Sequence, residues 1–163
     1  MLNKKDKIFI ENIAKQLQDK IRIEKQPNVY NYINIRDFIK SLKYDIAFNS
    51  QTNYIAGNII YLTCKEPNNE YNDKDYIMFQ QELLQQIWKV AKKKYKIPMM
   101  RFDETDATYF FRAMLMPESS FKKIVNDNAG EDGRCNINLV AKTFNVEVSD
   151  VKERGRDLGI WNC

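Results

Sequence analysis

Hydrophobic residues recur at helical spacing near the start of the chain and predict two amphipathic helices there. The first helix ends before Pro27, which cannot continue it, and its apolar side is formed by Ile10, Ile13, Ala14, Leu17 and Ile21. Asn34 is a favourable N-cap residue for the second helix, whose apolar residues are Ile35, Phe38, Ile39 and Leu42. We therefore expect two helices before any strand.

The pattern then changes to one that is typical of strands. Residues 44–48 alternate with a period of two, and residues 54–63 are rich in β-branched and aromatic side chains. Gly57 lies inside the second of these segments, where it favours a turn. These features predict a small sheet of two or three strands.

Helical spacing returns after a polar loop over residues 66–75. A long helix is predicted from Asp75 to Ile97, where Pro98 stops it, and its apolar positions are Phe79, Leu83, Leu84, Ile87, Trp88 and Ala91. Further helices are predicted from Asp103 or Thr105 to the break at Pro117, and over residues 119–125, 137–144 and 150–158. The fold class is therefore α+β, in one compact unit of 163 residues with a sheet-bearing lobe (1–100) and a helical lobe (101–163).

Composition is that of a globular protein that we expect in the cytoplasm. Hydrophobic residues make up 44% of the chain and charged residues 29%, so a packed core is expected. No apolar run approaches the roughly 20 residues of a membrane helix, and the first residues lack the apolar stretch of a secretory signal. Cys64, Cys135 and Cys163 form no C-x-x-C pair, so we expect reduced thiols and no cysteine zinc site.

The chain contains no histidine. This excludes Ser-His-Asp and Cys-His nucleophile activation, histidine acid–base catalysis and every metal site that needs imidazole. The five glycines form no phosphate-binding loop, so nucleotide binding is not expected. Carboxylates, lysines, tyrosines and cysteines remain as side chains with which the protein could do chemistry.

Two segments carry a resemblance to a known family. Residues 77–85 read IMFQQELLQ in the predicted long helix, and residues 106–117 read DATYFFRAMLMP. They resemble the ImmA/IrrE family of zinc metallopeptidase-like proteins, in which one helix carries Phe-Thr-x-Ala-His-Glu-x-Gly-His and a later helix carries Glu-Ala-Asn-x-Phe-Ala-x-x-Leu-Leu-Met-Pro. The second motif is matched in register by Ala107, Phe110, Leu115, Met116 and Pro117. The resemblance implies a zincin-like sheet and helices in the first lobe.

The resemblance continues into the last two predicted helices. The family follows its second motif with a helix-turn-helix-like unit, and residues 137–159 contain a similar pattern. Ala141 is small enough for a close helix crossing, and Asn145 suits a left-handed turn position. Val146 and Val151 are the expected core residues of the unit.

The residues that would hold zinc in that family are replaced here. Gln81 and Gln85 stand at the positions of the two histidines and Asp106 at that of the third ligand, while Glu82 is kept and Leu84 replaces a glycine. Imidazole binds zinc at about 2.0 to 2.1 Å, whereas a neutral amide oxygen is a weak donor that suits calcium better. Without a metal-bound water Glu82 has nothing to deprotonate, so we expect no metal, no cofactor and no catalysis.

Two uses stay open for Gln81, Glu82, Gln85 and Asp106, the four polar residues of this vestigial cleft. Amides readily satisfy neighbouring carboxylates, so the four residues could form a hydrogen-bonded polar patch. Alternatively, the cleft receives a peptide segment of a partner without cutting it.

The helix-turn-helix-like unit raises the question of nucleic-acid binding. Lys152, Arg154 and Arg156 are its candidate phosphate contacts. Residues 137–163 carry four basic and four acidic side chains, however, and a net charge of zero does little to neutralise phosphates. Gly155 also costs about 1 kcal/mol against alanine inside a helix. We expect the unit to be structural, with DNA binding as the alternative.

The positive charge of the chain is concentrated at the end of the long helix. Between Glu82 and Asp103 there are six basic residues and no acidic one: Lys89, Lys92, Lys93, Lys94, Lys96 and Arg101. Trp88 and Tyr95 are interleaved with them, which suits contact with phosphates or with an acidic partner surface. A solvated helix end, whose cations favour the helix dipole, explains the same residues.

Together these features predict a catalytically inactive ImmA/IrrE-like protein that acts by binding another macromolecule. Such proteins are commonly encoded beside repressors on phages and integrative elements, so the resemblance implies a regulatory protein whose partner is a repressor or a host protein, away from membranes. Frequent Asn, Lys, Ile and Tyr suit the AT-rich genome of a low-GC bacterium or its phage. A DNA-binding regulator and a residual hydrolase are the alternatives, and the sequence does not indicate an oligomeric state.

Overall fold

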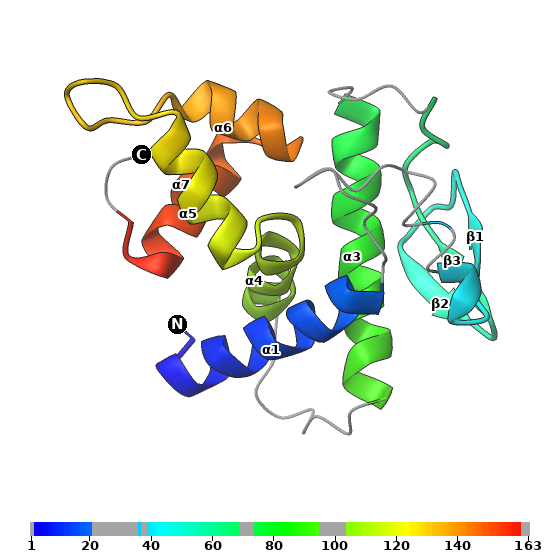
Figure 1. The fold of residues 1–163 in the computed structure, drawn as a ribbon. Helices are drawn as coiled ribbons and strands as arrows, with labels where there is room; N and C mark the ends of the chain where they lie inside the picture. Colours follow the sequence, from blue (N-terminus) through cyan, green and yellow to red (C-terminus); the bar gives the residue numbers. More distant parts are fainter. Residues whose placement is uncertain (1, 21–35, 37–38, 69–73, 95–103, 161–163) are drawn as a thin grey trace.

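The computed structural model describes residues 2–20, 36, 39–68, 74–94 and 104–160. Helix α3 (Lys74–Lys94) crosses the middle of the molecule, with a small sheet on one side and the helices α4 to α7 on the other (Figure 1). The protein is therefore an α+β structure built around one long helix. This placement explains the wide apolar surface of α3, on which all six predicted apolar positions are buried: Phe79, Leu83, Leu84, Ile87, Trp88 and Ala91.

The sheet has three short strands in the order β1-β3-β2. They are β1 (Asp45–Ala47), β2 (Tyr54–Ala56) and β3 (Ile59–Tyr61). β1 runs parallel to β3, and β2 pairs with β3 as an antiparallel hairpin in which Tyr54 lies opposite Tyr61. The turn of the hairpin contains Gly57 at φ +56°, a conformation that L side chains rarely adopt. The turn expected at Gly57 is thus confirmed.

The remaining described helices lie within a few residues of the predicted ones. They are α1 (Lys4–Lys20), α4 (Glu104–Leu115), α5 (Glu118–Asp127), α6 (Ile137–Phe144) and α7 (Val148–Leu158). The start of α7 lies two positions before the predicted Asp150. Most of the predicted second helix lies outside the described residues, although Ile39 is described and is buried.

The connections among the last helices use specific local geometry. Asn136 caps α6 by accepting a hydrogen bond from the backbone N–H of Leu139. Asn145, between α6 and α7, adopts the left-handed conformation expected from the sequence, with φ 53° and ψ 52°. Gly155 is buried in α7, and a Cβ there would meet the carbonyl oxygen of Ile160 at 3.0 Å. The glycine therefore allows the chain that follows α7 to fold back closely.

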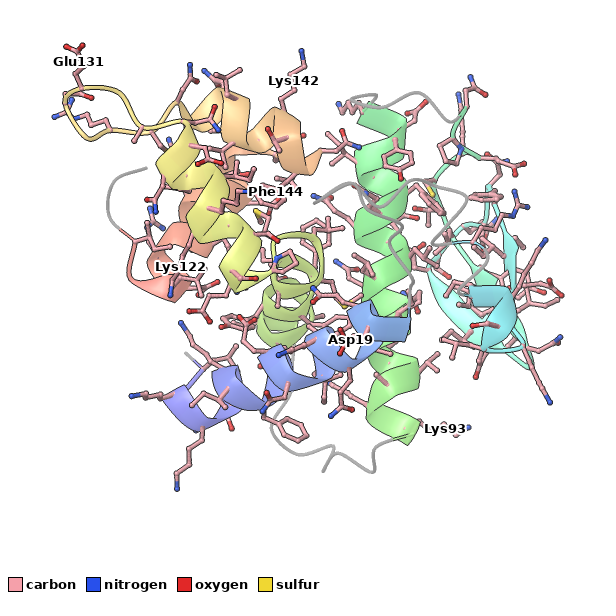
Figure 2. All side chains as sticks on the ribbon, viewed as in Figure 1. Asp19, Lys93, Lys122, Glu131, Lys142 and Phe144 are labelled. Carbon is pink, nitrogen blue, oxygen red and sulfur yellow. The ribbon has the colours of Figure 1, made fainter. Side chains whose placement is uncertain are left out.

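The core is continuous from the sheet to α7. α1 packs mainly on α4, and α4 packs in turn on α3 and α7. Figure 2 shows Phe144 of α6 directed inward, and its ring is tilted against that of Phe121 of α5. The packing of α1 on α4 crosses the boundary predicted near residue 100, because the first helix contacts the helical half of the chain. In the part of the chain that the structure describes, no helix is long and apolar enough to cross a membrane.

One cysteine differs from the prediction. Cys135 is disulfide-bonded, so the expectation of reduced thiols is wrong for this residue. Spacing along the sequence does not show which cysteines approach within the distance of a disulfide in the fold. Cys64 is a free thiol and is buried.

Candidate functional site

Glu82 joins α3 to the segment that follows β3. Its Oε2 accepts hydrogen bonds from the backbone N–H groups of Thr63 at 2.9 Å and Cys64 at 3.0 Å, and its Oε1 accepts one from the Thr63 hydroxyl at 2.5 Å. Both carboxylate oxygens are therefore occupied by donors of the protein. Burial, followed by the nearby Glu82 carboxylate, raises the pKa of the Cys64 thiol to about 12.

Gln81, one position earlier, faces a different neighbour. Its amide and the backbone N–H of Glu147 are hydrogen-bond donors to the carboxylate of Asp150, in the first turn of α7. Burial raises the pKa of Asp150, while the Arg112 guanidinium partly opposes that shift. The Oδ2 atom of Asp150 is buried without a hydrogen-bond partner among the described residues. Gln81 thus connects α3 to the C-terminal helices.

The other two residues of the predicted cleft differ in exposure. Gln85 is exposed on α3, whereas Asp106 is 1% exposed in the first turns of α4. Across the described residues, no three side chains of the His, Cys, Asp or Glu type are grouped so that they could hold a metal ion. The four polar residues of the predicted cleft therefore face different surroundings. Glu82 binds the segment after β3 and Gln81 faces α7, whereas Gln85 is exposed to solvent and Asp106 lies in the protein interior.

The largest buried polar group belongs to α7. Arg154 has no exposed surface; its Nε donates to the carbonyl oxygen of Met116, and its two terminal nitrogens donate to the two carboxylate oxygens of Glu11 in α1, at 2.5 and 3.1 Å. Glu11 also accepts a hydrogen bond from the hydroxyl of Tyr109 at 2.9 Å. Burial, and then the Glu11 charge, raises the pKa of Tyr109. This ion pair ties α1, α4 and α7 together.

A second ion-pair group lies one turn further along α7. Asp157 pairs with Arg112 of α4 at 2.9 Å and with Lys7 of α1 at 3.1 Å. Arg112 is 8% exposed and has therefore lost most of its contact with water, so the charge of Asp157 balances a largely buried cation. Both ion-pair groups fix the same three helices.

The burial of Arg154 corrects one sequence prediction. A side chain without exposed surface cannot reach a phosphate, so Arg154 is not a surface contact for nucleic acid. Lys152 and Arg156 are exposed, and Arg156 pairs with Glu153 on the same helix. Of the three predicted contacts, two remain available.

The basic residues predicted as a binding surface are partly described. Lys89 and Lys93 are exposed at the end of α3, and Figure 2 shows Lys93 directed away from the molecule. The ammonium of Lys92 lies 5.5 Å from the ring centroid of Trp88, which is within cation–π range. We refer to Lys89, Lys92 and Lys93 as the basic helix end. Lys96, Arg101 and the side chain of Lys94 lie outside the described residues.

Comparisons with protein families, with curated proteins and with solved structures find no match. The resemblance to the ImmA/IrrE family thus depends on the sequence motifs alone.

Sequence reasoning missed the partners of the polar residues. Thr63, Glu11 and Asp150 had no role in the sequence analysis, yet they hold Glu82, Arg154 and Gln81. Only Asp150 carried a signal, because an acidic residue in the first turn of a helix often accepts a hydrogen bond from the N-cap backbone. Thr63 and Glu11 lie far along the sequence from Glu82 and Arg154, the residues that they bind, so no local pattern indicates these contacts.

Proposed function

We propose that this protein is a non-catalytic relative of the ImmA/IrrE proteins that acts by binding another macromolecule. Its function is regulatory, as the resemblance to proteins of phages and mobile elements implies, and its partner is a protein with an acidic surface. Two observations support the proposal: the occupation of Glu82 and the exposure of the basic helix end.

The state of Glu82 carries the non-catalytic part of the proposal. A general base must have a free acceptor position within hydrogen-bond reach of the proton that it takes from water or from a bound nucleophile. Both oxygens of Glu82 accept hydrogen bonds from Thr63 and Cys64, which gives this carboxylate a structural role. Three of the roughly four acceptor positions of this carboxylate are taken by the protein itself, which favours a structural role over that of a base.

The basic helix end carries the binding part of the proposal. Exposed lysines at the C-terminal end of a helix add to the surface potential and contribute little to folding, because water already solvates them. An acidic partner would be attracted to this end of α3, with association that slows as salt screens the charges.

The binding test starts from a partner captured from the host and then measures its dissociation constant by titration calorimetry. Reversal of two exposed charges, Lys89→Glu with Lys93→Glu, should weaken binding at least tenfold at low salt and leave the melting temperature nearly unchanged. Lys40→Glu with Lys65→Glu is the matched control, since both lysines are exposed elsewhere and the net charge changes equally. Equal affinity of the two double variants would contradict the proposed surface.

The family relationship has a separate test. Gln81→His, Gln85→His and Asp106→Glu together should create zinc binding if these residues occupy the family's ligand positions. Titration calorimetry with zinc would measure the gain against the single variant Gln85→His. A triple variant that folds but binds zinc no better than the single variant would argue against the relationship.

DNA binding through α6 and α7 is the second candidate, favoured by the left-handed Asn145 between two short helices. A mobility-shift assay at about 150 mM salt tests it with Lys152→Ala and Arg156→Ala, whose side chains are exposed. Sequence-specific binding that these variants abolish would favour DNA over a protein partner. Arg154→Ala is unsuitable here because its loss would disturb the fold itself.

A further inference from the structure

The two edges of the sheet differ in how they are protected. The strand order β1-β3-β2 leaves β1 and β2 each with one side that pairs with no other strand among the described residues. Natural proteins commonly protect such edges from pairing with charged side chains or proline. Near β1 this protection is present, because Lys43 and Asp45 are exposed at its start. The free side of Tyr54–Ala56, which we call the β2 edge, has no charged residue and no proline.

The β2 edge lies in a stretch of the chain without charge. Residues 46–64 contain no charged side chain, although 29% of the whole chain is charged. The exposed side chains of this stretch are neutral, and Gln51, Thr52 and Asn58 are among them. Each chain carries a formal net charge of +4, so two copies repel each other least where charge is absent. This stretch therefore suits a neutral partner surface such as its own copy.

Two backbone hydrogen bonds show how the hairpin is oriented toward β1. The N–H of Asp45 donates to the carbonyl oxygen of Asn58 at 2.9 Å, and the N–H of Leu62 donates to that of Ala47 at 2.8 Å. Alternate residues of a strand direct their backbone groups to the same side. The even-numbered residues around β3 therefore face β1, and the odd-numbered ones face β2.

The same alternation leaves the backbone of Ile55 directed out of the sheet. In the hairpin Ala56 lies opposite Ile59, which faces β2, so these two residues form a hydrogen-bonded pair. Ile55 lies opposite Ile60, which faces β1, so the N–H and C=O of Ile55 point away from β3. Among the described residues, no segment outside the hairpin forms a backbone hydrogen bond with these two groups.

The side chain of Ile55 is also incompletely covered. Ile46, Ile60 and Ile55 are neighbours across the three strands, and Ile60 has no exposed surface, so this row faces the core. Ile60 lies between two strands, whereas Ile55 ends the row and stays partly exposed. A further β-branched side chain beside Ile55 would continue the row.

We propose that a second copy of this chain pairs with the β2 edge, so that two sheets join into one continuous sheet. A two-fold axis perpendicular to the sheet makes the two β2 strands antiparallel. The outward N–H and C=O of Ile55 then bond to the same groups of the second copy. The basic helix end lies on α3 and takes no part in this contact, so the proposal does not depend on the proposed function.

This register also places a large side chain beside a small one. With Ile55 on the two-fold axis, Tyr54 of each copy lies opposite Ala56 of the other, in a pair whose Cα atoms are about 4.5 Å apart. Tyr54 is 42% exposed and stacks on Tyr61, and Ala56 is exposed. The Tyr54 ring thus covers the methyl group of Ala56 in the second copy.

The position and length of β2 limit the occupant and the strength of the contact. Figure 1 shows the sheet on the side of α3 away from α4 to α7, so a second copy can approach without meeting these helices. Nucleic acid or an acidic segment would need cations, which residues 46–64 lack. Because β2 is short, we expect a reversible dimer with a dissociation constant on the order of 10 to 100 µM.

Sedimentation equilibrium of the full-length protein, over about 5 to 500 µM, measures the dimer. Ala56→Lys should raise the dissociation constant at least tenfold, because its charge would lie against the second copy. Ala129→Lys is the matched control, since Ala129 is exposed between α5 and α6. Lys89→Glu with Lys93→Glu should leave the dimer unchanged, and added salt should not weaken it, because no charge pair holds it.

Cysteine cross-linking tests the register. Tyr54→Cys and Ala56→Cys place their thiols within disulfide reach only between a copy of one variant and a copy of the other. After oxidation with copper phenanthroline, the mixture should contain more cross-linked dimer than either variant alone. Wild-type protein treated in the same way accounts for the cysteines that the chain already has.

Each measurement has a result that would overturn the proposal. A wild type that stays monomeric up to about 500 µM would leave the β2 edge to a strand of another protein. A dimer that Ala56→Lys and Ala129→Lys weaken equally, or cross-linking that is equal in the mixed and unmixed samples, would place the contact elsewhere on the molecule.

Discussion

Removal of the Arg154 side chain should be among the most damaging single changes in this protein. Arg154→Ala would leave the Glu11 carboxylate with the Tyr109 hydroxyl as its remaining partner among the described residues, and the Met116 carbonyl without its donor, where residue 154 has no exposed surface. Breaking a buried ion pair from one side costs about 3 to 5 kcal/mol. We expect a loss in this range and not above it, because Glu11 is 24% exposed and its carboxylate can regain some water.

The magnitude can be measured by urea denaturation followed by circular dichroism. A loss of about 3 to 5 kcal/mol corresponds to a fall in the melting temperature of roughly 6 to 20 °C for a domain of this size. Arg156→Ala is the control on the same helix, since its ion pair with Glu153 is exposed, and it should change the free energy of unfolding by less than about 0.5 kcal/mol.

A double-mutant cycle with Glu11→Gln completes the experiment. If the two residues act as a pair, Arg154→Ala should cost clearly less in the Glu11→Gln background than in the wild type. A loss below about 1 kcal/mol for Arg154→Ala, or full additivity in the cycle, would refute the reasoning from burial and pairing.

Three further predictions concern the neighbouring polar groups. Glu82→Gln should lower the free energy of unfolding by about 1 to 3 kcal/mol in urea titrations, because an amide NH₂ would face the donors of Thr63 and Cys64 that the carboxylate now accepts, and a neutral effect would contradict the structural role of Glu82. Cys64 should resist iodoacetamide at pH 8 in the folded protein and react after urea unfolding, as its pKa of about 12 and its burial imply, and peptide mass spectrometry would detect any labelling that says otherwise. Asp150→Asn should stabilise the protein at pH 7, because burial raises the folded pKa of Asp150 and so makes its ionisation unfavourable for folding. The Asp150 carboxyl contributes fully to stability below its unfolded pKa and loses that contribution as pH rises through the folded value, so the gain of the variant should vanish in unfolding curves as pH falls below the ordinary pKa of 3.8.

Local patterns in the sequence predicted most of the elements but not how they pair. Pro117 and Gly57 mark a helix break and a hairpin turn because each restricts or permits particular backbone angles, whatever surrounds it. The alternation in residues 44–48 indicates a strand, but it does not reveal that β1 lies parallel beside β3 at the sheet's edge. Strand order depends on contacts between segments, which periodicity does not encode.

The site was less predictable than the fold for a similar reason. Arg154 lies among charged residues on an amphipathic helix, where the usual expectation is exposure, and its partner Glu11 is 143 positions away. Gln81 and Glu82 are neighbours in the sequence, but they point about 100° apart on α3 and so meet α7 and the sheet separately. A motif read along the chain groups such residues together, whereas the helix separates them.

The ion pair between α1 and α7 has a consequence for the order of events during synthesis. α1 leaves the ribosome before α7, and Glu11 finds its partner only when residue 154 has emerged 143 positions later, which at about 5 to 20 residues per second takes roughly 7 to 29 seconds. The apolar side of α1 can pack on α4 before then, but Glu11 lacks its buried cation until α7 arrives, so we expect α1 to be held less firmly up to that point. Closure of this long loop, together with the Lys7–Asp157 pair that spans 150 positions, would then complete folding in one late step.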